Sequence, residues 1–139
     1  MKKPFLLLAI KSAIILYFAA CTSIEHFTVA RSATPIVTRG SWKINLHKDA
    51  NNDKTNDLAG YTFTFSSSGV VKANKNGVII NGNWAEDNIS NHITIDLGTT
   101  DPSLKILNSN WSIQEVSGKK VNLQYDGGNE TEKLDITRL

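Results

Sequence analysis

The sequence has one cysteine, no long apolar run and little net charge, and each shortage excludes a class of protein. One cysteine among 139 residues cannot form the internal disulfides of a stapled mini-protein. The longest uninterrupted apolar run, residues 13–21, has nine residues. A membrane-spanning helix needs about 20, so a polytopic membrane protein is excluded. A net charge of +2 is too small for a basic nucleic-acid module, and we expect no nucleic-acid partner.

The small positive charge belongs to the N-terminus. Lys2, Lys3 and Lys11 lie in the first 20 residues, which contain no acid. The remaining 12 basic and 13 acidic residues leave a net charge of −1 after position 20. With 40% apolar and 20% charged residues, the chain is expected to fold around a core. Its length allows one domain, or one domain with a short appendage.

Residues 1–20 are typical of a signal peptide. A positive start at Lys2 and Lys3 precedes an apolar region that ends in the small residues Ala19 and Ala20. An uncleaved N-terminal helix is the alternative. Residues 21–39 have no sustained period and contain Pro35, so we expect a tether between the N-terminus and a domain at 40–139.

The segment Phe18-Ala19-Ala20-Cys21 resembles the cleavage box of bacterial lipoproteins, although Phe18 stands where an aliphatic residue is usual. The resemblance implies a lipid on Cys21, which would also explain a lone cysteine without an internal partner. Several acyl chains would anchor the protein stably to a membrane. Secretion with a free Cys21 is the alternative. Because Thr22 is not Asp, the resemblance implies an outer-membrane lipoprotein of the cell envelope that faces the periplasm, with surface exposure left open.

Apolar and polar residues alternate along the whole of residues 40–139, which predicts β-strands. Turn residues separate neighbouring segments, and Asn76-Gly77 is the strongest hairpin signal. Eight segments alternate in this way, namely 42–46, 61–65, 71–73, 78–84, 93–97, 111–113, 121–125 and 134–136.

Asp101-Pro102 interrupts this pattern and predicts one short helix between strands five and six, with Asp101 as its cap. Eight short strands with mostly short connections favour an all-β fold, an eight-stranded antiparallel up-and-down barrel. A two-sheet β-sandwich is the alternative.

Gly40-Ser41-Trp42 at the start of the first strand resembles the G-x-W signature of the lipocalins. In that family the tryptophan packs at the closed end of the barrel and an arginine near the C-terminus covers it. The resemblance therefore implies a barrel-end pair of Trp42 and Arg138.

A more specific resemblance, over about residues 40–139, is to uncharacterised lipocalin-like lipoproteins of Bacteroidetes-type bacteria. It rests on residues 60–65 with their Ser-Ser-Gly turn, Gly82-Asn83-Trp84, Asp101-Pro102 and Trp111. The chain lacks the Thr-Asp-Tyr motif of the lipocalins and is shorter than they are. The closer resemblance implies a fold and no established activity.

The inner face of the predicted barrel is aromatic and uncharged, so a ligand inside it would be apolar or aromatic. A packed core without a cavity is the alternative, since eight strands leave little room. The small residues Ala73 and Gly82 are the places where space is expected. The candidate ligand-binding residues are Trp42, Tyr61, Phe63, Phe65, Ala73, Gly82, Trp84, Trp111 and Tyr125.

The loop 49–57 carries oxygen-bearing side chains at alternate positions, as the start of an EF-hand calcium loop does. Lys54 and Gly60 stand where that loop has its glycine and its bidentate glutamate. We therefore expect a solvated loop and assign no metal ligands.

Nothing in the sequence points to catalysis. His47 and His92 are predicted on the polar side of their strands, and no Gly-x-Ser-x-Gly, His-Glu-x-x-His or phosphate-binding glycine loop occurs. We expect no enzyme and no cofactor. The expected function is binding of a small apolar ligand, and the alternative is a protein-interaction or inhibitor module that acts through loops 49–57 and 99–110.

Overall fold

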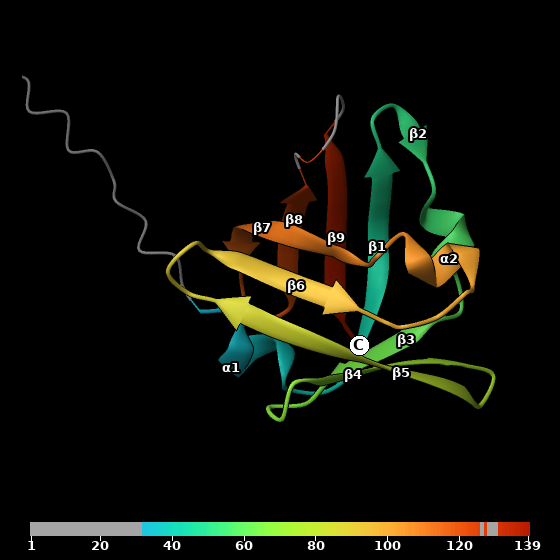
Figure 1. Cartoon of the computed structure of the whole chain (residues 1–139), viewed down its shortest axis with the longest axis horizontal. Coiled ribbons are helices and arrows are strands. Elements are labelled where there is room, and N and C mark those ends of the chain that lie inside the picture. Colours follow the sequence, from blue (N-terminus) through green and yellow to red (C-terminus); the bar gives the residue numbers. More distant parts are fainter. Residues whose placement is uncertain (1–31, 126, 128–130) are drawn as a thin grey trace, which may run out of the picture.

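The computed structural model describes residues 32–125, 127 and 131–139 (Figure 1). Strands dominate this part of the chain, and its three helices are single turns. In chain order the elements are α1 (Thr34–Val37), β1 (Trp42–Asp49), β2 (Asn52–Asp53), the 3-10 helix η1 (Thr55–Leu58), β3 (Thr62–Phe65), β4 (Val70–Lys75), β5 (Val78–Asp87), β6 (His92–Asp96), α2 (Pro102–Lys105), β7 (Ser109–Val116), β8 (Lys120–Tyr125) and β9 (Glu132–Arg138).

The strands form a closed antiparallel barrel. From β3 to β9 each strand pairs with the next along the chain, and β9 returns to pair with β1 from Trp42–Arg138 to Asp49–Glu132. The two-residue strand β2 only extends the end of β1 as a hairpin. The predicted eight-stranded up-and-down barrel is therefore confirmed, and the β1–β9 pairing excludes the sandwich.

Local sequence signals account for the connections. Asn76 and Gly77 both have positive φ values, 53° and 83°, as the hairpin turn between β4 and β5 requires. Asp101 caps α2, because its carboxylate accepts a hydrogen bond from the Ser103 amide at 2.9 Å, and Pro102 occupies the first turn. The predicted short helix is confirmed between β6 and β7.

One prediction about β1 is wrong. A bulge between Ile44 and Leu46 shifts the register of β1 against β9. After the bulge the alternation reverses, so Leu46 is half-buried and His47 is 1% exposed. His47 therefore belongs to the barrel interior and not to the polar side.

The tether predicted for residues 21–39 is also wrong over its last residues. Ala33 and Val37 are buried in the core, and the Trp42 indole donates to the Val37 carbonyl at 2.8 Å. Glu86 accepts hydrogen bonds from the main-chain amides of Ala33 and Thr34 and from the Ser32 hydroxyl. The folded domain thus includes residues 32–39, and α1 closes one end of the barrel.

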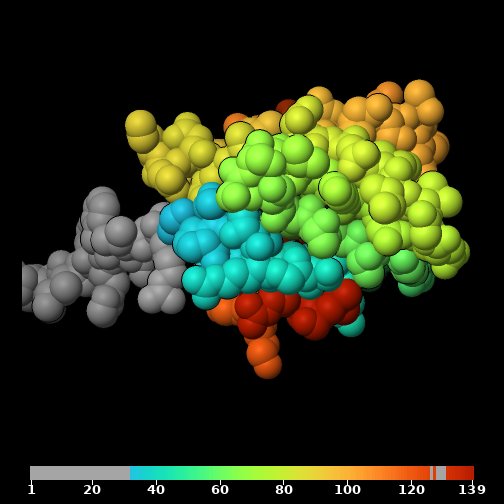
Figure 2. Space-filling view, turned by 90° about the horizontal axis from the view of Figure 1, so that it is seen from below, coloured from blue at the N-terminus to red at the C-terminus, as the bar shows by residue number. Residues whose placement is uncertain are grey.

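The other end of the barrel is covered by η1 and α2, which contact each other. Leu58 from η1 and Leu104 and Leu107 from the α2 region are buried there. β1 and β3 share a single ladder pair, Trp42–Phe63, and η1 packs against β1 beyond it. Figure 2 shows the separation of the two ends, with α1 beside the β5–β6 turn at one end and the β4–β5 hairpin with α2 at the other.

Candidate functional site

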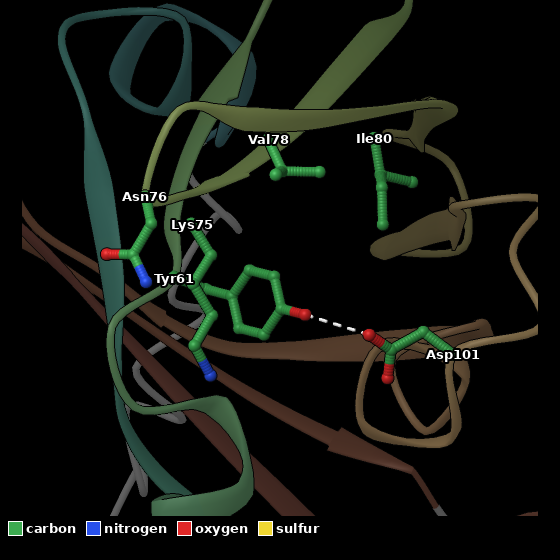
Figure 3. Close-up of a pocket in the computed structure, with 6 residues that line it drawn as sticks. All are labelled: Tyr61, Lys75, Asn76, Val78, Ile80 and Asp101. Atoms are coloured by element: carbon green, nitrogen blue, oxygen red, sulfur yellow. Dashed lines mark hydrogen bonds between the residues drawn. The ribbon is translucent and has the colours of Figure 1, made fainter.

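A pocket of about 300 Å³ opens at the end of the barrel that η1 and α2 cover (Figure 3). We call it the mouth pocket. It lies where the β4–β5 hairpin projects beside the segment that leads into α2. Its lining residues are Tyr61, Lys75, Asn76, Val78, Ile80 and Asp101.

A hydrogen-bonded pair holds one side of the mouth pocket in place. The Tyr61 hydroxyl donates to Asp101 Oδ2 at 2.8 Å, and this bond raises the pKa of Tyr61 above its ordinary value. The same bond, together with the Ser103 amide, lowers the pKa of the Asp101 carboxyl. Asp101 is therefore ionised at neutral pH, and Tyr61 is a neutral donor already used by Asp101.

The opposite side of the mouth pocket is apolar and exposed. Val78 is 66% exposed and its neighbour Ile79 is 53% exposed. They stand at the start of β5, before Asn83, where the pairing with β6 begins. In Figure 3 Val78 and Ile80 point from β5 toward the Tyr61 ring. An aliphatic surface thus faces an aromatic ring across the pocket.

Most of the nine interior residues proposed from sequence lie in the core, but they line little of the mouth pocket. Seven of them are buried, Tyr125 is half-buried, and Gly82 is half-buried as well. Only Tyr61 also lines the mouth pocket. Sequence reasoning missed Lys75, Asn76, Val78, Ile80 and Asp101. A signal existed in Val78-Ile79-Ile80, because three successive aliphatic residues cannot all face the interior of one strand.

The tryptophans of the interior already have hydrogen-bond partners. The indole N–H groups of Trp42, Trp84 and Trp111 each donate to a main-chain carbonyl, those of Val37, Ser66 and Leu107, at 2.8–2.9 Å. These bonds fix α1, the β3–β4 turn and the end of the α2 region to the barrel. Phe65 and Trp84 also pack edge to face, with ring centres 5.4 Å apart. The aromatic interior therefore holds connecting segments in place.

The expectation of space at Gly82 is wrong. An ideal Cβ at this position would lie 2.3 Å from the main-chain oxygen of Asp96 and 2.5 Å from Leu97 Cα. The end of β6 therefore fills the place where a side chain would stand. Gly82 permits close approach of two backbones. Ala73, which pairs with Ile80 in the same ladder, is fully buried in the core.

The residues of the implied barrel-end pair lie opposite each other. Trp42 and Arg138 are cross-strand partners in the β1–β9 ladder. Trp42 is fully buried, and the Arg138 side chain passes over Gly40, whose ideal Cβ would lie 3.7 Å from Arg138 Cδ. This arrangement belongs to the closed end, away from the mouth pocket.

The loop 49–57 folds into the β1–β2 hairpin and η1. The Lys54 ammonium, at the place of the EF-hand glycine, binds Asp49 Oδ2 at 2.7 Å. Within residues 32–125, 127 and 131–139, no group of three or more His, Cys, Asp or Glu side chains could hold a metal ion.

The predicted signal peptide, Cys21 and the tether up to residue 31 lie outside the described residues. In the part of the chain that the structure does describe, no helix combines the length and the apolar character needed to cross a membrane.

Solved structures of similar fold come from Bacteroides species. A DUF4847 family protein from Bacteroides vulgatus aligns with a TM-score of 0.59 at 15% identity, over 78% of this chain and 98% of its own. A lipocalin-like protein from Bacteroides uniformis aligns with a TM-score of 0.51 at 15% identity, over 73% and 98%. An uncharacterized protein from Bacteroides eggerthii aligns with a TM-score of 0.50 at 17% identity, over 70% and 97%.

No family model matches the chain, and no curated protein matches it at a significant level. TM-scores of 0.50–0.59 establish a shared fold, and at 15–17% identity they establish nothing about ligands. The lipocalin-like fold expected from Gly40-Ser41-Trp42 is therefore confirmed. The chain has the lipocalin-like antiparallel β-barrel fold of these Bacteroides proteins.

Proposed function

We propose that this protein is a lipid-anchored envelope protein that binds a small, largely apolar molecule in the mouth pocket. The observation that carries the proposal is an aliphatic surface, formed by the exposed Val78 and the half-buried Ile80, that faces the Tyr61 ring across about 300 Å³. This volume is at the lower end of the range for small-molecule pockets. Such pockets combine apolar walls with a few polar groups, and the polar side chains Tyr61, Lys75 and Asp101 line the mouth pocket.

The mouth pocket suits binding better than catalysis. Its acidic group, Asp101, has both carboxylate oxygens in hydrogen bonds, one to Tyr61 and one to the Ser103 amide. A carboxylate held in this way is a poor proton acceptor, because its pKa is lowered. We therefore propose a non-enzymatic function. The proposed ligand site is the mouth pocket and not the barrel interior that the aromatic residues led us to expect.

The lipid anchor is part of the proposal and rests on the sequence. Cys21 follows an apolar segment and two small residues, and it is the only cysteine. We propose that a lipid on Cys21 holds the barrel at the outer membrane on its periplasmic side, with the cell surface as the alternative.

A substitution of Val78 by Asp tests the mouth pocket. Val78 is 66% exposed, so the variant should fold, while a carboxylate beside the Tyr61 ring should repel an apolar ligand. We expect the purified full-length chain to bind the neutral probe N-phenyl-1-naphthylamine, and Val78→Asp to weaken that binding about tenfold. Fluorescence titration measures both affinities.

Ile89→Asp is the matched control, because Ile89 is fully exposed in the β5–β6 turn at the opposite end of the barrel. It should bind the probe as the unaltered chain does. Equal loss of binding in both variants would refute the mouth pocket as a ligand site.

The alternative function, a protein-interaction module, draws on one observation. Ile79 is 53% exposed near the start of β5, between Val78 and Ile80, which line the mouth pocket together with Asp101 of the loop 99–110 that was proposed as a contact surface. Under this alternative, a partner bound by the unaltered chain would be lost on replacing Ile79 by Asp, and probe binding in the mouth pocket would be absent.

A further inference from the structure

Lys75 is the charged side chain of the mouth pocket whose hydrogen-bonding capacity is unused. Its ammonium lies 4.7 Å from the centre of the Tyr61 ring. Counting only the described residues as possible partners, it forms no ion pair and no hydrogen bond. An ammonium has three donors, and its contact with the face of an aromatic ring uses none of them as a conventional hydrogen bond.

The pocket's carboxylate does not occupy this cation. Asp101 is close enough to Lys75 for an electrostatic interaction that lowers the Asp101 pKa, but the two form no ion pair within 4 Å. Asp101 instead binds Tyr61 and the Ser103 amide. Lys75 is therefore the group that can meet the charge of an incoming molecule.

We infer that the ligand of the mouth pocket is a small anionic amphiphile, with its apolar body on Val78 and Ile80 and its acidic group on Lys75. This inference rests on the proposed function and names the class of ligand. Charge-assisted hydrogen bonds from an ammonium are stronger than neutral ones. The flexible stem of lysine lets the ammonium follow a carboxylate, sulfonate or phosphate of varied shape.

Two matched probes test the inference on the full-length chain. 1-Anilinonaphthalene-8-sulfonate carries a sulfonate, and N-phenyl-1-naphthylamine has the same aromatic body without it. We expect the anionic probe to bind about tenfold more tightly, as one charge-assisted hydrogen bond predicts. Dodecanoate should displace it, and dodecanol should displace it about tenfold less well.

The variant Lys75→Met tests whether Lys75 causes the preference for the anionic probe. Methionine keeps the apolar stem and removes the charge, so the two probes should then bind with equal affinity, and Lys75→Arg should keep the preference. Lys72→Met is the matched control, because Lys72 lies exposed on the outer face of the same strand. Circular dichroism and unfolding curves establish that all three variants are folded.

The outcomes separate the inference from the proposed function. A preference for the anionic probe that disappears in Lys75→Met and persists in Lys72→Met supports the inference. Binding of both probes with equal affinity, or a preference that survives Lys75→Met, overturns it and leaves the proposed function standing. Binding of neither probe overturns the proposed function itself.

Discussion

His47 is buried in the barrel interior, although the alternation of the sequence predicts it on the polar face of β1. It is buried next to Trp111 in a T-shaped arrangement, with ring centres 6.5 Å apart, and neither of its ring nitrogens has a hydrogen-bond partner among the described residues. The nearest carboxylate oxygen, from Glu132, is 3.7 Å from Nε2, beyond hydrogen-bond range. Burial lowers the pKa of His47, and Lys54 adds to this, while Glu132 and Asp49 oppose it.

His47 should therefore make the fold sensitive to mild acid. With a folded-state pKa below the ordinary 6.5, His47 is protonated more readily in the unfolded chain. The free energy of unfolding should then fall as the pH drops below about 6.5. Leucine at this position removes the buried imidazole, so His47→Leu should change stability by less than about 1 kcal/mol at pH 7.5 and should reduce the loss on acidification. Urea unfolding at pH 7.5 and 5.0 measures the stability at neutral pH and its loss in acid. If His47→Leu leaves the pH dependence unchanged, His47 is not its cause.

Among the elements, α1 depends on a contact distant in sequence. Its four residues are too few for a helix that is stable alone. Glu86, on β5, receives the hydrogen bonds of the Ala33 and Thr34 amides, at 2.6 and 2.8 Å. Burial alone would raise the Glu86 pKa, but the hydrogen bonds from Thr34, Ala33 and Ser32 outweigh it, and the pKa is lowered.

Glu86→Gln should loosen α1. Glutamine has similar size but lacks the charge, so we expect a loss of about 1–3 kcal/mol of stability at pH 7. Glu115→Gln, at an exposed position on β7, should have little effect. Because the folded-state pKa of Glu86 is below the ordinary 4.5, its stabilisation is present above that pH and is lost as the pH falls through the lowered pKa. Urea unfolding from pH 7 to pH 3 measures this stabilisation. If Glu86→Gln is as stable as the unaltered protein at pH 7, the Glu86 carboxylate does not provide it.

For the whole molecule, α1 and the mouth pocket lie at opposite ends of the barrel. β5 has Val78 at the pocket and Glu86 at α1, so the two ends are separated by about 26 Å of extended strand. The chain between Cys21 and Ser32 can span at most about 40 Å. A lipid on Cys21 would thus connect the membrane to the α1 end of the barrel, and the mouth pocket lies at the opposite end.

Attachment to the membrane at the α1 end requires a lipid on Cys21, which metabolic labelling tests directly. Cells supplied with an alkyne-tagged fatty acid should label the unaltered protein, while Cys21→Ala should carry no label. Ser23→Ala, two residues further on, should be labelled normally. A labelled Cys21→Ala protein, or an unlabelled parent, would show that Cys21 is not the attachment point.

The sequence by itself determined the barrel. Period-two alternation, the Asn76-Gly77 turn and the Asp101-Pro102 cap are local signals, and each specifies a strand, a hairpin or a helix turn without help from distant residues. Their order and short spacing then favour an up-and-down barrel. The burial of Trp42, Phe63 and Trp111 follows from the same alternation.

Only the tertiary structure decided where ligand-sized space lies. The bulge that turns His47 inward, the backbone that fills the place beside Gly82, and the contact of α1 with Glu86 all depend on a neighbouring strand or segment. The mouth pocket likewise joins Tyr61, the β4–β5 hairpin and Asp101, which are up to 40 residues apart. Alternation along one strand reports which way a side chain points, but the distance to the opposing chain is set by packing between strands.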